Sequence, residues 1–189
     1  MVAPPLLFRN ECAIIEKNVA RALCAKSEYR EVNMLAPEIP NNSLTKEINE
    51  IVDIAVKLEG IKRFVFNAPA TDIEISTLEK LINHSLPEDY KDFLRFSNGM
   101  IMNNYSADFF NIDMIINHFH QDKAEWFPTD YIVIAEIIGD GEVLCLSSIS
   151  GKFIRYFDGE ETFFNSFKEA LNNIIDHIKT IDEDYLLEE

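Results

Sequence analysis

The sequence lacks the features that several large classes of protein require. Its 189 residues contain only three cysteines, an odd number without a Cys-x-x-Cys spacing, which argues against a disulfide framework and for reduced thiols in a cytoplasm. The N-terminus has no basic stretch followed by a long apolar segment, and no uninterrupted apolar run reaches the roughly 18 residues that a membrane span needs. We therefore expect a cytoplasmic protein that does not bind membranes.

The motifs of common enzyme classes are also missing. The sequence contains no Gly-x-Ser-x-Gly, no phosphate-binding loop, no His-Glu-x-x-His and no Gly-x-Gly-x-x-Gly. Its one close pair of histidines is His118 and His120, near Asp113 and Asp122, and on a strand this spacing would place both imidazoles on one face. A metal site needs several convergent ligands, which nothing here fixes, so a metal-dependent enzyme is the least favoured hypothesis. We expect no catalytic residues, no metal and no cofactor.

Basic residues are scarce. The chain has 17 Lys and Arg against 33 Asp and Glu, for a net charge of −16. Residues 1–43 are neutral, so the whole excess lies in 44–189, and residues 104–189 alone hold 18 acidic and 5 basic side chains. A surface of this kind repels nucleic acid and anionic membranes and attracts basic partners. We therefore expect a protein partner and no nucleic acid.

Amphipathic helices are predicted along the first half of the chain. Apolar residues at helical spacing indicate helices over 11–26 and 44–58, the second closed by Gly60. Pro37 and Pro40 interrupt the pattern between these helices. We therefore divide the chain into an N-terminal helical extension and connector at 1–43, a domain at 44–181 and an acidic tail at 182–189.

Two further helices are predicted within residues 71–99. Thr71 and Glu74 form a capping box, after which apolar residues repeat at helical spacing. Pro87 suits the first position of the second helix, with Ser85 and Glu88 able to cap around it, and an Asn-Gly pair ends that helix. The apolar positions of the two helices are Ile75, Leu78, Ile82, Tyr90, Phe93 and Leu94.

Short apolar runs bounded by turn residues predict strands in the second half. They lie at 64–66, 100–102, 108–112, 131–138, 143–147 and 153–157, with 113–127 left open between helix and other structure. A Gly-Asp-Gly turn follows residue 138, and Ser166 with Glu169 caps a last helix whose apolar face continues to Ile181. Helices, then strands, then a helix favour an α+β fold in which several helices pack against an antiparallel sheet.

The exact amino-acid sequence of residues 86–99 indicates more than the presence of two helices. Leu86-Pro87-Glu88-Asp89-Tyr90, followed by Phe93-Leu94 and Asn98-Gly99, resembles the signature of the SUKH superfamily, which is named in part after a Smi/Knr-type fungal regulator of cell-wall synthesis. The resemblance extends from about Leu44 to Ile178. Most members look like bacterial immunity proteins that neutralise toxins, so the resemblance implies an α+β domain that binds a protein and catalyses nothing.

Two acidic turns are the strongest candidates for partner binding. Asp140 and Glu142 flank Gly141 in the first turn. Asp158, Glu160 and Glu161 lie around Gly159 in the second. Carboxylates in such turns are commonly just solvated, and neither turn supplies the full ligand pattern of a calcium loop. We predict that these five residues bind a cognate toxin and occlude it, as an acidic face would occlude the basic cleft of a nuclease-type toxin. The alternative is a regulatory scaffold that binds an endogenous protein.

Overall fold

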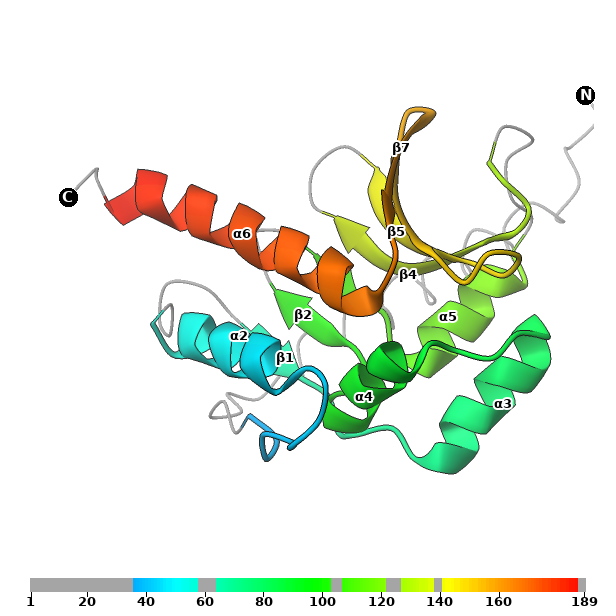
Figure 1. The fold of residues 1–189 in the computed structure, drawn as a ribbon, viewed down its shortest axis with the longest axis horizontal. Coiled ribbons are helices and arrows are strands. Elements are labelled where there is room, and N and C mark those ends of the chain that lie inside the picture. Colours follow the sequence, from blue (N-terminus) through cyan, green and yellow to red (C-terminus); the bar gives the residue numbers. More distant parts are fainter. Residues whose placement is uncertain (1–35, 58–63, 103–106, 122–126, 138–140, 187–189) are drawn as a thin grey trace, which may run out of the picture. The chain divides into compact units, whose positions relative to one another are not determined.

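Seven strands form one antiparallel sheet among the residues that the computed structural model describes, which are 36–57, 64–102, 107–121, 127–137 and 141–186 (Figure 1). The order of strands in the sheet follows the sequence, and each strand pairs antiparallel with the next. The strands are β1 (Phe64–Phe66), β2 (Met100–Met102), β3 (Asp108–Phe109), β4 (Tyr131–Ile137), β5 (Glu142–Ser147), β6 (Phe153–Phe157) and β7 (Glu160–Phe164).

Five helices accompany the sheet in the described part of the chain, which confirms the α+β class. They are α2 (Thr45–Lys57), α3 (Asp72–Ile82), α4 (Glu88–Phe96), α5 (Ile112–Phe119) and α6 (Phe167–Leu186). Helix α6 contacts β6, β7, α2 and α4, while α5 contacts β4 and α3. The predicted helix at 11–26 and the predicted helix end at Gly60 lie outside the described residues. No described helix is both long and apolar enough to cross a membrane.

The capping box predicted for α3 is present. The Glu74 amide donates to Thr71 Oγ1 at 3.2 Å, and the Thr71 amide donates to Glu74 Oε2 at 2.7 Å. The Thr71 amide and the Thr71 hydroxyl both donate to the Glu74 carboxylate, and these two hydrogen bonds lower the pKa of the Glu74 carboxyl below its ordinary value. Helix α3 ends at Asn83, which has a left-handed conformation with φ of 52°. Both ends of this helix are therefore determined by its local sequence.

The start of α4 differs from the prediction by one residue. Pro87 is the N-cap rather than the first helical residue, because its ψ of 141° is extended, and the helix begins at Glu88. Ser85 does not cap α4, since its hydroxyl donates to Glu79 Oε1 at 3.2 Å. The same Glu79 oxygen accepts the Leu86 amide at 2.9 Å. A carboxylate of α3 thus orders the turn that leads into α4.

Asn98 and Gly99 join the end of α4 to the start of α5. Asn98 Oδ1 accepts the amide of Ile112, the first residue of α5, at 2.9 Å. Gly99 has a φ of +80°, and a Cβ added there would lie 2.6 Å from the Asn111 nitrogen and 2.7 Å from the Phe109 oxygen. The pair therefore does more than stop a helix, because it allows two backbone segments to approach closely.

The buried aromatic residues hold α4 and α6 against the sheet. The ring of Phe167 lies 4.9 Å from that of Tyr90, 5.1 Å from Phe93 and 5.4 Å from Phe153, measured between centroids. All four side chains are almost fully buried, and each such burial stabilises the fold by about 1.5–3 kcal/mol. Burial also raises the pKa of the Tyr90 phenol. The apolar residues of the 86–99 signature are therefore part of the scaffold.

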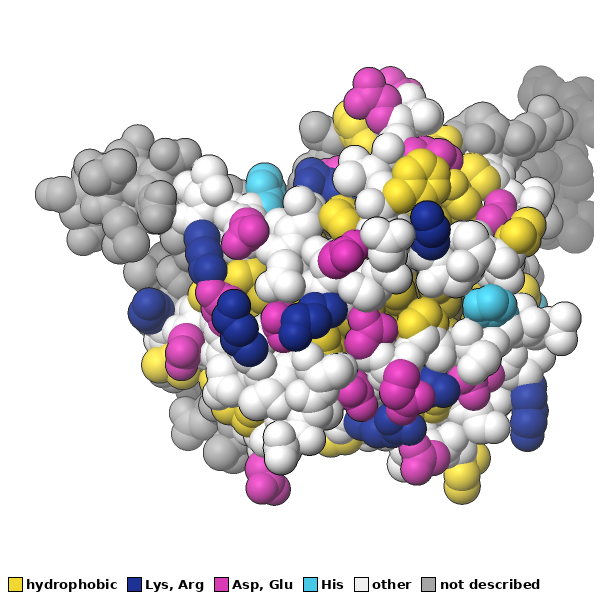
Figure 2. All heavy atoms as spheres, in the orientation of Figure 1, with side chains coloured by type: hydrophobic (Ala, Val, Ile, Leu, Met, Phe, Trp, Pro, Cys, Tyr) yellow, Lys and Arg dark blue, Asp and Glu magenta, His cyan; other side chains and the backbone are white. Residues whose placement is uncertain are grey.

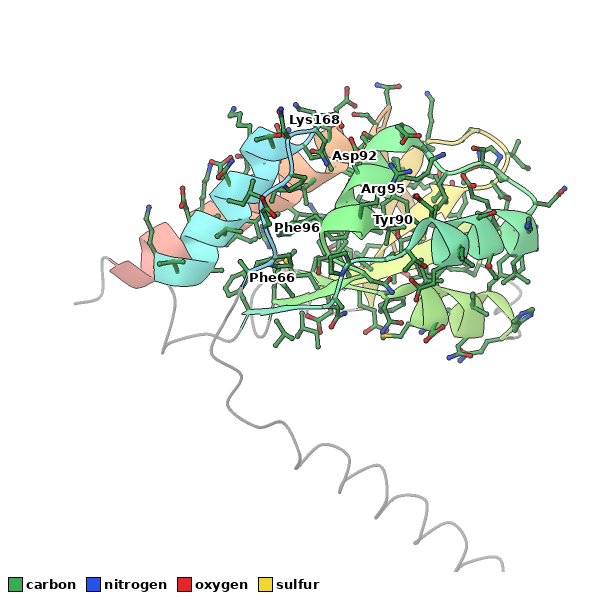
Figure 3. All side chains as sticks on the ribbon, turned by 90° about the horizontal axis from the view of Figure 1, so that it is seen from below. Phe66, Tyr90, Asp92, Arg95, Phe96 and Lys168 are labelled. Atoms are coloured by element: carbon green, nitrogen blue, oxygen red, sulfur yellow. The ribbon has the colours of Figure 1, made fainter. Side chains whose placement is uncertain are left out.

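A buried carboxylate and a lysine connect α2 to α6. Glu47 in α2 is 1% exposed, and its Oε1 lies 3.3 Å from the Nζ of Lys168 in the first turn of α6. Lys168 Nζ also donates to the Ser43 carbonyl at 3.0 Å, and the Ser43 hydroxyl donates to Asp92 Oδ2 at 2.8 Å. Figure 3 shows Lys168 and Asp92 on this side of the domain, where α2 passes α4 and α6. The last residue of the predicted connector is thus bonded to the domain.

Three boundaries in the second half differ from the sequence predictions. The strand predicted at 108–112 ends at Phe109, so residues 110–112 are not in a strand, and Asn111 instead caps α5 by accepting the Met114 amide on its Oδ1 at 2.8 Å. The strand β7 was not predicted, since its sequence starts with two glutamates instead of an apolar pattern. Helix α6 runs to Leu186 and so includes the first five residues of the segment predicted as an acidic tail, 182–186.

Candidate functional site

Both candidate acidic turns lie at the same end of the sheet. Antiparallel strands alternate in direction, so the β4–β5 and β6–β7 connections share one end, and the β5–β6 connection with Lys152 lies at the other. We call this end the acidic end, defined by Glu136, Glu142, Asp158, Glu160 and Glu161. Four of these five residues were predicted from the sequence, all except Glu136. Asp140 was predicted as well but lies outside the described residues, so its role stays a prediction.

The β6–β7 connection is a tight two-residue turn. Asp158 and Gly159 have φ values of 47° and 85°, as a type I′ turn requires, and Phe157 pairs with Glu160 across it. Asp158 and Glu160 are exposed, and Glu160 begins β7 instead of lying in the turn as predicted. Figure 2 shows acidic side chains gathered at a projecting tip, which Figure 1 identifies as this hairpin. A regular ladder therefore holds these carboxylates in place.

Glu142 has a cation partner. It is the first residue of β5, where a turn position was predicted, and both of its carboxylate oxygens bind Arg155 of β6. The Arg155 Nη2 to Glu142 Oε2 distance is 3.0 Å, and Arg155 Nη1 donates to Asn173 Oδ1 of α6 at 3.2 Å. The pair ties the sheet to the helix, so Glu142 has a structural role and carries less unbalanced charge than its neighbours.

Glu161 lies above a cluster of aromatic residues. Its Oε1 accepts the hydroxyl of Tyr131 at 2.7 Å, which connects β7 to β4 across the outer face of the sheet. Tyr131 packs in a buried cluster with Cys145, Ile154 and Tyr156. Burial raises the pKa of the Tyr131 phenol, and the Glu161 carboxylate raises it further. Glu161 is itself exposed, so this hydrogen bond fixes the direction of a carboxylate that remains accessible to a partner.

A fourth accessible carboxylate, Glu136, was not among the predicted site residues. The register places Glu136 opposite Asp108 on one side and Val143 on the other, and the same row continues through Tyr156 to Glu161. Side chains in one such row project from the same face of a sheet. Glu136 and Glu161 are three strands apart, or about 14 Å at the usual strand spacing. The signal in the sequence was a single charged residue within the apolar run at 131–138.

The acidic end has little compensating positive charge. Between residues 131 and 164 the only basic residues are Lys152, at the opposite end of the sheet, and Arg155, which binds Glu142. Within the described part of the chain, no basic side chain lies within ion-pair distance of Glu136, Asp158, Glu160 or Glu161. Like charges in this arrangement produce a negative potential that extends into solvent.

The histidine pair does not form a metal centre in the described structure. His118 lies in the last turn of α5 and His120 follows it, and residues two apart in a helix do not share a face. The His118 ring packs 4.7 Å from the Phe110 ring. The described residues contain no group of three or more His, Cys, Asp or Glu side chains placed to hold a metal ion. Asp122 lies outside those residues.

A family model matches the part of the chain that contains these features. The model of the SMI1 / KNR4 family (SUKH-1) matches residues 69–173, from the residue pair before the α3 capping box into α6. The match therefore includes the α3–α4 hairpin, the Asn98-Gly99 junction and the acidic end of the sheet. No curated protein matches the chain. Because the matched region is more than half of the sequence, the chain belongs to the SMI1 / KNR4 family (SUKH-1).

Proposed function

We propose that the protein is an immunity protein that binds a toxin through the acidic end of its sheet. Family membership supports an immunity or regulatory role. The observation that carries the finer proposal is the cluster of accessible carboxylates from β4 and the β6–β7 hairpin, without a cation partner among the described residues. The four residues of this cluster are Glu136, Asp158, Glu160 and Glu161.

The mechanism is occlusion of a basic cleft. A nuclease-type toxin must attract phosphate, so its cleft carries Lys and Arg, and a rigid acidic hairpin competes for the same groups. Long-range attraction speeds the encounter, and close carboxylate–guanidinium pairs then slow dissociation. The tight turn and the Tyr131–Glu161 hydrogen bond hold the carboxylates in position before binding, which reduces the entropy lost in the complex. No catalytic group is needed for this task.

Growth rescue tests the proposal. The genes next to this one are searched for a toxin domain, and the candidate found there is expressed in a host cell with the wild-type protein or with the triple variant Asp158→Asn, Glu160→Gln, Glu161→Gln. Each amide keeps the size of the carboxylate and one of its two acceptor oxygens, so the variant should fold normally. We expect rescue by the wild-type protein and loss of rescue by the triple variant.

A matched control separates the site from net charge. The variant Glu38→Gln, Asp53→Asn, Asp113→Asn changes the net charge by the same amount at exposed positions away from the acidic end. This control should still rescue growth. Rescue by both triple variants would contradict the proposed site. Failure of the wild-type protein to rescue would contradict the immunity function and favour the regulatory scaffold.

A further inference from the structure

The outer edge of β7 presents unpaired backbone groups. No strand pairs with it on that side among the described residues. The Ser147 amide donates to the Lys152 carbonyl at 2.9 Å, so the backbone of residue 152 bonds toward β5. Because successive residues of a strand bond to opposite neighbours, the backbones of residues 154 and 156 also bond toward β5, while those of 153, 155 and 157 bond toward β7. Their partners across the hairpin are residues 164, 162 and 160. The amides and carbonyls of Glu161 and Phe163 therefore point away from the sheet.

The side chains along this edge leave room for another strand. Residues 160–163 are exposed and Phe164 is half-buried, so the strand is open to solvent along its length. Phe163 is 54% exposed and projects from the same face as Glu161, which lies two residues before it. Glu160 projects from the opposite face. An added strand would thus meet an aromatic ring and one carboxylate on one face, and a second carboxylate on the other.

Charge decides what kind of strand fits. A second copy of β7 paired antiparallel about Thr162 would place four carboxylates, Glu160 and Glu161 from each copy, within one short ladder. In this register the two Glu161 side chains would be diagonal neighbours on one face, and their like charges oppose self-association, as charged residues on edge strands commonly do. A segment with Lys or Arg in the same places would be attracted instead. The edge therefore favours a basic partner over a second copy of this chain.

We propose that β7 accepts an extended, basic segment of the partner protein as an eighth, antiparallel strand, an inference that rests on the proposed function. The partner's residues opposite Glu161 and Phe163 exchange backbone hydrogen bonds with them. From its N-terminus to its C-terminus, the segment carries an apolar residue opposite Phe163, any residue opposite Thr162, and basic residues opposite Glu161 and Glu160. The backbone supplies affinity and this pattern supplies specificity.

A peptide with that pattern tests the pairing without the toxin. The probe is acetyl-Thr-Ile-Thr-Lys-Lys-Thr-amide, titrated to millimolar concentration against the full chain and followed by the amide signals of the protein in NMR. We expect the largest chemical-shift changes at the Glu161 and Phe163 amides. N-methylation of the isoleucine and the first lysine removes the two donors that face β7 and should weaken binding about thirty-fold.

A matched peptide distinguishes strand pairing from simple charge attraction. N-methyl groups on the central threonine and the second lysine lie on the amides that face away from β7, and binding should remain close to that of the parent peptide. No shift at Glu161 and Phe163, or equal binding of the two methylated peptides, would overturn the strand addition. Neither result would affect the growth-rescue test of the acidic end. The strand-addition proposal can therefore be wrong while the proposed immunity function remains supported.

Variants of the protein provide a second readout. Phe163→Pro removes the outward-facing amide, whereas Phe163→Val removes the ring but keeps the amide and the preference for a strand. Both variants are compared with the wild-type protein by circular dichroism before binding is measured. The valine variant should retain most of the peptide affinity and the proline variant should lose it. Equal loss in two folded variants would contradict a backbone contact.

Discussion

Replacement of Gly99 by alanine should destabilise the fold through two effects that the structure separates. The first is conformational: φ at Gly99 is +80°, and a residue with a Cβ loses about 1–2 kcal/mol in this left-handed region. The second is steric, because the new Cβ would lie 2.6 Å from the Asn111 nitrogen and 2.7 Å from the Phe110 carbonyl carbon. Those are backbone atoms, which cannot rotate away as a side chain could.

The size of the effect follows from these two contributions. Overpacking of a close contact typically costs about 1–3 kcal/mol, and the lower entropy of an unfolded chain with alanine recovers about 0.4–1 kcal/mol. We therefore expect Gly99→Ala to lower the free energy of unfolding by about 1–4.5 kcal/mol. The hydrogen bond from the Ile112 amide to Asn98 should also lengthen, because β3 and the start of α5 must move apart from residue 99.

Gly159→Ala is the matched control. Gly159 has a φ of +85°, but a Cβ added there meets no atom within 4 Å, so only the conformational cost applies. Equilibrium unfolding in urea, followed by circular dichroism, compares the two variants with the wild-type protein. Gly99→Ala should cost at least about 1 kcal/mol more than Gly159→Ala, which is the lower end of the overpacking cost. Equal losses would refute the close approach at the Asn98-Gly99 junction.

Three further predictions concern charge. Burial raises the pKa of the Glu79 carboxyl, but its hydrogen bonds lower this pKa more, so the net shift is to below the ordinary value of 4.5. The ionised Glu79 therefore stabilises the fold above the ordinary pKa, and this stabilisation is lost as the pH falls through the lower pKa of the folded state. Glu79→Gln should therefore flatten the pH dependence of the urea midpoint in acid. A double-mutant cycle of Glu142→Gln and Arg155→Gln should give a coupling of about 1 kcal/mol in unfolding, and no coupling would remove the structural role of Glu142. Glu160→Thr with Glu161→Thr should increase dimer formation in sedimentation velocity relative to the wild-type protein.

The sequence predicted the α3–α4 hairpin well because its determinants are local. The Thr71–Glu74 capping box joins residues three apart, and the apolar positions at helical spacing are the ones that become buried. The pattern of the 86–99 signature likewise predicted the family. What the sequence could not provide was the second role of Gly99, because its close contacts come from Phe109, Phe110 and Asn111.

The candidate site was predicted less completely, for the same reason. Asp158 does lie in a tight turn, but Glu160 and Glu161 belong to a strand that exists because it pairs with β6. The pairing of Glu142 with Arg155 joins side chains 13 residues apart on neighbouring strands. Glu136 enters the acidic end only through the register of β4. Cross-strand neighbours of this kind are set by tertiary structure and leave no periodic signal.

The dependence of affinity on salt tests the central claim most directly. The dissociation constant of the purified complex with the candidate toxin domain from the growth-rescue test is measured at low and high salt, for the wild-type protein and for Asp158→Asn, Glu160→Gln, Glu161→Gln. The account predicts that wild-type affinity falls steeply as salt rises and that the triple variant binds weakly with a much flatter dependence. Wild-type binding that does not change with salt, or an equally steep dependence in the triple variant, would contradict recognition through the acidic end.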